Sequence, residues 1–138
     1  MTLVVPNVGE VVALNAITGK TAATTLTLRL FSNNHTPGAS STASDLTEVA
    51  GGGYSAIALT ASSWSTTGGS PTSSAYPEQT FTFTGATDSP GTIYGYYLTN
   101  AAGTLVLAER LAATFTPAAN GDTVKVTPTI TLASVSGD

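Results

Sequence analysis

The stretch Thr25-Leu26-Thr27-Leu28-Arg29-Leu30-Phe31 decides the fold of this chain. Leucine occupies every second position from Leu26 to Leu30, and successive side chains of a β-strand point to opposite faces of a sheet. The alternation therefore predicts a strand over 25–31 with its leucines on a buried face. Threonine on the other face fits this prediction, because a stiff, β-branched side chain tolerates a solvated strand face.

Similar patterns further along the chain predict four more strands. They are expected at 78–84, where Phe81 and Phe83 share a face, and at 93–99, 105–110 and 123–132. Residues 100–103 predict a hairpin loop between the second and third of these strands. Pro128 lacks an amide donor, so the last strand is expected to lie at a sheet edge or to contain a bulge there.

Turn-forming residues separate the predicted strands, at spacings of roughly 8–12 residues. The clusters are Asn33-Asn34, Thr36-Pro37-Gly38, Gly51-Gly52-Gly53, Gly68-Gly69, Ser89-Pro90-Gly91 and Asn120-Gly121-Asp122. Many short strands with this spacing predict an all-β fold, an antiparallel β-sandwich of jelly-roll or immunoglobulin-like type. One short N-terminal helix is an open alternative near Glu10–Ile17, with Asn7 as its cap and Gly19 as its stop.

The length of 138 residues fits one domain, and no charge block or proline-rich linker divides it. We therefore expect a single β-sandwich domain over 1–138. Residues 1–8 are expected to form an N-terminal arm that adds a strand to a neighbouring subunit or lies along it. Residues 134–138 are expected to form a polar, less ordered tail.

The charge content excludes several classes of function. The chain has 4 Lys and Arg against 8 Asp and Glu, with 26 Thr and 14 Ser, so nucleic acid is not an expected partner. No apolar run approaches the roughly 20 residues that span a bilayer, and the first residues lack the pattern of a signal peptide. Without cysteine the chain has no disulfide, thiol nucleophile or Cys-based zinc site.

No catalytic pattern is evident, so we expect no enzymatic activity, no cofactor and no metal site. His35 is the only histidine and lies in a loop-like stretch, where an ordinary structural role is favoured over that of a ligand or general base. The eight acidic residues include no calcium-loop pattern. Gly51-Gly52-Gly53 lacks the Lys-Ser/Thr that follows in a phosphate-binding loop.

Two arginines and six large aromatic residues leave alternatives open. Glu109 and Arg110 are interpreted first as a surface ion pair, although Arg29 and Arg110 could each tie a strand end to a carboxylate or to a partner chain. The aromatic residues could pack in the core, anchor a protein interface or stack on sugars, in that order of preference. They are Tyr54, Trp64, Tyr76, Tyr94, Tyr96 and Tyr97.

The order of several short motifs resembles small proteins of tailed-phage structural gene clusters. The motifs are Leu3-Val4-Val5-Pro6-Asn7-Val8-Gly9-Glu10, Leu28-Arg29-Leu30-Phe31-Ser32-Asn33-Asn34-His35-Thr36-Pro37, Asp45-Leu46-Thr47-Glu48, Gly53-Tyr54, Trp64, Phe81-Thr82-Phe83, Ile93-Tyr94-Gly95-Tyr96-Tyr97 and Ala108-Glu109-Arg110. The resemblance spans almost the whole chain, and its motifs carry no catalytic signature.

The resemblance implies a virion component, with a capsid decoration (cement) protein as the favoured role. It would be made in the host cytoplasm, lie on the capsid surface, contact the major capsid protein and form a homo-oligomer, with a trimer suspected. The residues expected at its interfaces are Leu3, Val4, Val5, Tyr54, Trp64, Tyr76 and Arg110. The alternatives are a tail, connector or fibre-associated subunit and a carbohydrate-binding module.

Overall fold

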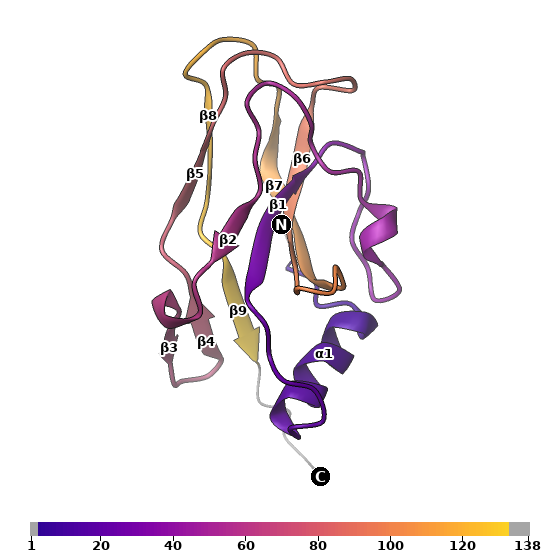
Figure 1. Cartoon of the computed structure of the whole chain (residues 1–138), viewed down its shortest axis with the longest axis vertical. Coiled ribbons are helices and arrows are strands. Elements are labelled where there is room, and N and C mark those ends of the chain that lie inside the picture. Colours follow the sequence, from indigo (N-terminus) through magenta and orange to yellow (C-terminus); the bar gives the residue numbers. More distant parts are fainter. Residues whose placement is uncertain (1–2, 133–138) are drawn as a thin grey trace.

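The computed structural model describes residues 3–132, which form a β-sandwich with a short N-terminal helix (Figure 1). The elements are α1 (Asn7–Ile17), β1 (Leu26–Phe31), η1 (Ala43–Asp45), β2 (Ile57–Leu59), η2 (Ala61–Ser63), β3 (Ser65–Thr67), β4 (Thr72–Ala75), β5 (Gln79–Thr82), β6 (Ile93–Thr99), β7 (Leu105–Phe115), β8 (Thr123–Val126) and β9 (Thr129–Leu132). The expected all-β class is confirmed. The predicted tail, 134–138, and the first two residues of the predicted arm lie outside the described residues.

One layer is an antiparallel sheet in the order β2-β1-β6-β7. The predicted strands at 25–31 and 93–99 are confirmed as β1 and β6, which pair through Leu28 and Leu98. The predicted loop at 100–103 is also confirmed: Asn100 accepts and donates backbone hydrogen bonds there, and Gly103 has φ 84°. β7 continues past the predicted end at residue 110 as far as Phe115. Its pairing with β6 changes register at Tyr94, between the pairs Gly95–Arg110 and Ile93–Phe115.

The second layer corrects the prediction of one continuous strand over 123–132. That segment forms β8, paired with β5, and β9, paired with β4. Ala75 pairs with Thr129, and Gln79 pairs with Val126. The chain therefore takes four residue steps from Ala75 to Gln79 but only three from Val126 to Thr129 on the opposite side. This one-residue offset is a bulge beside Pro128, whose carbonyl accepts the amide of Tyr76 at 2.8 Å.

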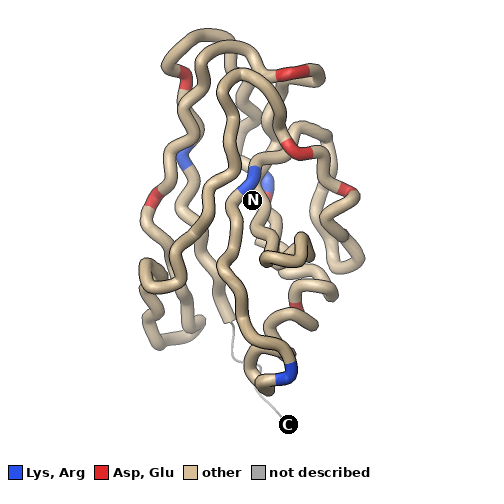
Figure 2. Tube along the Cα trace, in the orientation of Figure 1, with Lys and Arg blue, Asp and Glu red and all other residues tan. Residues whose placement is uncertain are grey.

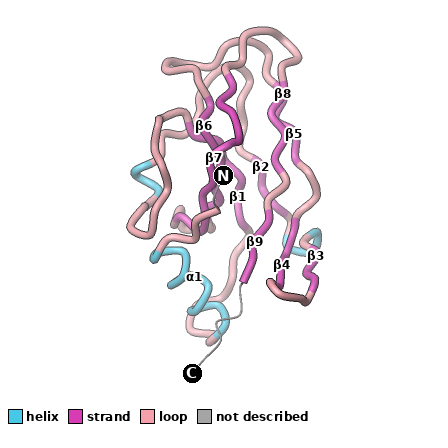
Figure 3. The backbone as a smooth tube through the Cα atoms, turned by 180° about the vertical axis from the view of Figure 1, so that it is seen from behind, coloured by secondary structure: helices cyan, strands magenta, loops and turns pink. Residues whose placement is uncertain are grey.

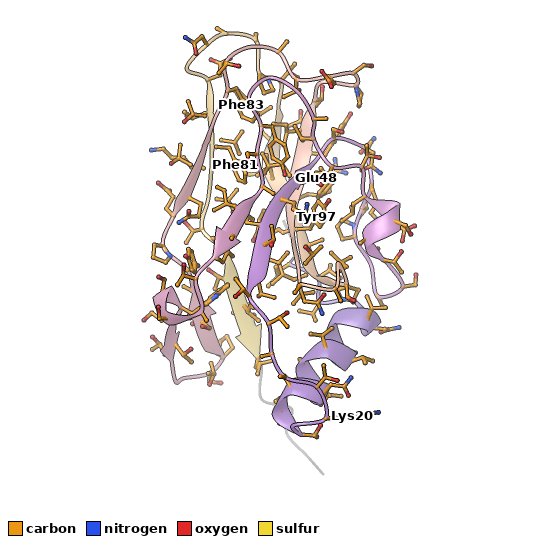
Figure 4. All side chains as sticks on the ribbon, viewed as in Figure 1. Lys20, Glu48, Phe81, Phe83 and Tyr97 are labelled. Carbon is orange, nitrogen blue, oxygen red and sulfur yellow. The ribbon has the colours of Figure 1, made fainter. Side chains whose placement is uncertain are left out.

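The main core lies between the two layers. The fully buried Leu28 and Leu30 of β1 belong to the same cluster as Phe81 and Phe83, which Figure 4 labels among the interior side chains, and Val124 of β8. A smaller cluster covers the other face of the first sheet, where the rings of Phe31 and Tyr97 lie 6.3 Å apart. β6 is therefore buried on both faces.

The short N-terminal helix, which the sequence left as an open alternative near Glu10–Ile17, forms at one end of the sandwich (Figure 3). Its predicted cap is wrong: Pro6 occupies the N-cap position, and Asn7 is the first helical residue. Pro6 is fully buried, and its φ of −71° suits a helix start. Gly19, with φ 74°, follows the helix end as expected. Among residues 3–132 the structure contains no helix with the length and apolarity needed to cross a membrane.

Candidate functional site

The helix α1 contacts the sandwich mainly through its first turns. Gly9 is its one buried residue, and its Cα lies so close to β7 that an added Cβ would overlap the carbonyl oxygen of Val106. Glycine is thus required for this close approach of two backbones. The preceding segment is held to the same strand, because Val4 and Ala108 exchange backbone hydrogen bonds of 2.9 and 3.0 Å.

The outward side of α1 exposes large apolar side chains. Val11 is 56% exposed, Leu14 60% and Ile17 74%, and we call these three residues the ridge. Only Leu132 joins them as an exposed large hydrophobic residue in the described part of the chain. A surface helix normally carries charged or polar residues on its outer face, so this ridge indicates a surface that binds something.

The inward side of α1 borders an apolar groove of about 570 Å³. The groove lies between the helix, the segment before β1 and the β6–β7 hairpin, and its walls include Val12, Ala16, Ala22, Ala23, Leu26 and Val106. No residue of its lining is charged. Figure 4 places Lys20 beyond the end of α1, and Glu10 is the charged residue within the helix. Val11 also lines this groove, whereas Leu14 and Ile17 lie on the outer side of the helix, where Glu10 is exposed as well.

The structure places the predicted arm residues Leu3, Val4 and Val5 on their own chain. All three are half-buried, and Leu3 and Val5 pack against the main core. Val4 forms its bridge to Ala108, and the helix starts at Asn7. Their role at an interface between subunits stays a prediction.

The three aromatic residues predicted at an interface also contact their own chain. Trp64 and Tyr76 form an edge-to-face pair with ring centroids 5.3 Å apart, and Tyr54 stacks on Phe81 at 5.7 Å. The Tyr76 hydroxyl accepts the amide of Thr60 at 2.9 Å. None of the six large aromatic side chains weighed as a sugar platform is fully exposed, so core packing, the favoured interpretation, describes them best.

The interpretation of Glu109 and Arg110 as a surface ion pair is wrong. Neighbouring residues of a strand point to opposite faces, which separates the two side chains. The Arg110 guanidinium donates to the Asn34 side chain and the His35 carbonyl, each at 2.9 Å, and lies over the Tyr94 ring. Glu109 instead accepts the hydroxyl of Tyr96 at 2.8 Å. Arg110 thus ties β7 to the loop that follows β1.

Arg29 forms an ion pair with Glu48, in which each side chain is about one third exposed. Its Nη1 donates to both carboxylate oxygens of Glu48 at 2.9 Å, and its Nε donates to the hydroxyl of Thr99 at 3.1 Å. The Tyr54 hydroxyl donates to the same carboxylate at 2.9 Å. Burial raises the pKa of Tyr97 to about 12, and the charge of Glu48 adds to this effect. This network fixes the segment after η1 against the sheet.

The remaining candidates for chemistry have structural partners. His35 Nε2 lies 3.0 Å from the hydroxyl oxygen of the buried Ser41, which accepts the Gly38 amide at 2.9 Å, so the pair closes a loop. A second hollow of about 300 Å³ lies between β7 and β8, where Glu109 is already bonded to Tyr96. Within residues 3–132 no three acidic or histidine side chains gather to hold a metal ion.

The ridge residues Val11, Leu14 and Ile17 were not among the predicted interface residues. The sequence carried a signal for them, because Asn7–Ile17 contains a single charged residue and has apolar side chains on every side. A helix that is apolar all round is usually buried, and here its own domain leaves Leu14 and Ile17 exposed. A scan of protein-family models, a search of curated proteins and a search of solved structures each gave no match to this chain.

Proposed function

We propose that this protein is a structural subunit of a virus particle, a capsid decoration (cement) protein that bridges major capsid subunits. The observation that supports an assembly role is the apolar helix α1, with its exposed ridge and uncharged groove. The choice of the capsid surface among possible assemblies comes from the resemblance of the sequence motifs. In this role the protein works in the virion, after synthesis in the host cytoplasm.

The mechanism is stabilisation by binding to the assembled state. A subunit that binds several capsid subunits at once, and binds them only when they are assembled, shifts the equilibrium towards the shell. A typical specific interface buries about 1,600 Å² in total, and many copies on a closed shell act together. Modest contacts by each copy therefore suffice.

The surface of the sandwich suits such packing. Charged residues are sparse along the chain, and the end that carries α1 shows one acidic segment in the helix and one basic segment beyond it (Figure 2). Threonine occupies exposed positions on β5 and β8, opposite the buried Phe81 and Val124. The same face carries Lys125, whose charge is balanced by Glu78 at 3.8 Å, so it bears no unpaired charge of its own.

The test is the copy number of the protein in purified intact particles. A ratio near one copy for each major capsid protein is expected for a lattice-wide decoration role. A few copies in each particle would point instead to the tail, connector or fibre position, and absence from particles would contradict the proposal. Shells prepared with and without the protein provide the functional readout, since the decorated shells should withstand a higher temperature before they open.

A further inference from the structure

We propose that Asn120 is a site of deamidation, and that the fold protects it through the hydrogen bond that fixes the Gly121 amide. Asn120 lies in the turn at 118–122 that precedes β8, at the end of the sandwich opposite α1 (Figure 1). The reaction needs only water as its co-reactant. The inference therefore concerns the isolated chain and does not rest on the proposed function.

The reaction closes a ring between Asn120 and Gly121. The backbone nitrogen of Gly121 attacks the side-chain carbon Cγ of Asn120, so that an N–Cγ bond forms. The Cγ–Nδ2 bond breaks, and ammonia leaves with the proton that the Gly121 nitrogen has lost. Water then opens the succinimide ring at either of its carbonyls. Opening at Cγ gives aspartate, and opening at the backbone carbonyl gives isoaspartate, in which the chain runs through Cβ.

The residue after Asn120 makes it the most reactive asparagine of the chain. A side chain on the following residue crowds the attacking nitrogen and restricts its backbone, whereas glycine leaves both free. The other asparagines precede valine, alanine, asparagine or histidine, and Asn120 alone precedes glycine. Asn120 is also exposed to the water that completes the reaction.

The fold requires glycine at position 121. The Gly121 amide donates to the Phe83 carbonyl and the Phe83 amide donates to the Asp122 carbonyl, both at 2.8 Å, so two residues face one across the strand pair. This is the pattern of a bulge whose first residue is a glycine with positive φ. Gly121 has φ 98°, at which any other residue would be strained. The bulge therefore keeps a reactive Asn-Gly sequence in the chain.

The same bulge holds the attacking nitrogen back. Its proton is bonded to the Phe83 carbonyl and has to be lost before the ring closes, and the nitrogen has to leave the strand pair to reach Cγ of Asn120. Phe83 is fully buried in the main core, so its carbonyl does not follow. Asn120 therefore reacts only after the start of β8 has separated from Phe83.

Asp122 holds the turn closed from the other side. Its carboxylate accepts the amides of Ala118 and Ala119, both at 2.9 Å, and its own amide donates to the Ala119 carbonyl at 3.2 Å. Pro117, which precedes them, is fully buried. Opening of the turn breaks these bonds together with that of Gly121. The free energy of this local opening therefore sets the rate of the reaction in the folded protein.

The experiment follows the mass of the fragment that contains Asn120, which gains about 1 Da on deamidation. The full chain is incubated at one mildly alkaline pH, folded in buffer or unfolded in urea, and is digested at intervals. A peptide of residues 116–126 in both solvents measures the effect of urea on the chemistry itself. The unfolded chain should deamidate first at Asn120, and the folded chain at least about tenfold more slowly. In Asn120→Gln the modification should disappear, because the attack would need a larger ring.

Asp122→Ala tests the turn in the folded protein. It removes both hydrogen bonds of the carboxylate, so Asn120 should deamidate at least about tenfold faster than in the wild type. The matched control is Asp45→Ala, which removes a carboxylate that accepts the Thr42 amide at 2.8 Å in another loop. This control should leave the rate at Asn120 unchanged. Circular dichroism checks that both variants are folded.

A measurement on the wild type is independent of the variants. Urea below the unfolding midpoint should speed the deamidation of Asn120 and the hydrogen exchange of the Gly121 amide in parallel. Equal rates at Asn120 in the folded and the unfolded chain would overturn the proposal, as would an unfolded chain that deamidates elsewhere first. An unchanged rate in folded Asp122→Ala, or an equal acceleration in Asp45→Ala, would overturn it too.

Discussion

Leu28 is fully buried in β1, between Ile57 of β2 and Leu98 of β6. An aspartate there would have to ionise in an apolar interior or pay the cost of protonation, several kcal/mol in either case. This is comparable with the whole stability of a typical domain, about 5–15 kcal/mol. We therefore predict that Leu28→Asp does not fold. Thr25→Asp, at an exposed position three residues earlier, is the control. A Leu28→Asp variant with a native spectrum and cooperative melting would show that the register of this strand is wrong.

Asp122 supplies a different test at the scale of one residue. Its carboxylate accepts the amides of Ala118 and Ala119, both at 2.9 Å, and these bonds lower its pKa below that of an ordinary aspartate. Because the pKa of Asp122 is lower in the folded state, its ionised carboxylate contributes its full stabilisation at pH values above the unfolded pKa, about 3.9. It is lost as the pH falls below that value, through the folded pKa.

We expect Asp122→Asn to reduce the loss of stability on acidification. Urea midpoints measured between about pH 5 and pH 2 should fall less steeply in the variant than in the wild type, because asparagine has no proton to bind. Asp45, whose pKa the backbone and side chain of Thr42 also lower, continues to titrate in both proteins and contributes to the remaining slope. Equal slopes for the two proteins would contradict this account.

At the scale of elements, the sequence predicted those strands whose alternation is strong within a few residues. β1 and β6 carry large apolar side chains at regular spacing, so a local pattern was enough. β3 and β4 consist of Ser, Thr and Ala, and β3 is exposed along its length, so no such pattern marks them. Their pairing, for example Thr66 with Ser74, comes from the long-range arrangement of the chain. The division of β8 from β9 likewise needed the opposite strand, because a bulge is a property of a pair.

The candidate site was predicted less well than the fold. Aromatic residues such as Trp64 and Tyr76 suit a core and an interface equally, because each has an apolar body and a polar tip. Sequence patterns could not decide between these environments, and the structure pairs the two rings with each other. The ridge was overlooked because valine, leucine and isoleucine in a helix ordinarily mark a buried side. Only the structure shows that Leu14 and Ile17 face outward.

Gly9 gives a prediction about the helix as an element. Alanine is the better helix former by about 1 kcal/mol, which would favour Gly9→Ala in an isolated helix. Here the new methyl group would overlap the backbone of Val106, and such overpacking costs about 1–3 kcal/mol. We expect Gly9→Ala to loosen α1, so that its amides exchange hydrogen at least tenfold faster while those of β1 and β6 keep their protection.

Gly38→Ala is the matched control for that measurement. An added Cβ at Gly38 meets no atom within 4 Å, and its backbone is not in the left-handed region. Its substitution should leave the exchange of α1 unchanged. If Gly9→Ala kept the protection of α1, the helix would have to be held by contacts other than its close approach to β7.

At the scale of the whole molecule, Glu10 is the one charged residue within α1, the surface that the sandwich offers for assembly. The ion pairs within residues 3–132 join Arg29 to Glu48 and Lys125 to Glu78, and neither lies on α1. Association through α1 would therefore gain its free energy from apolar burial, while the net charge of the copies opposes it. These two terms respond differently to salt, which makes the balance between them measurable.

We predict that association of the wild-type chain strengthens as sodium chloride is raised from about 10 mM to about 0.15 M. The Debye length falls over this range from roughly 30 Å to 8 Å, which screens the repulsion between copies that each carry a formal charge of −4. Apolar burial is not weakened by the added salt, so the association constant should rise severalfold. Sedimentation equilibrium at fixed pH measures this directly. An association constant that falls with salt would mean that attraction between opposite charges holds the copies together, and apolar burial could not then be the main contact.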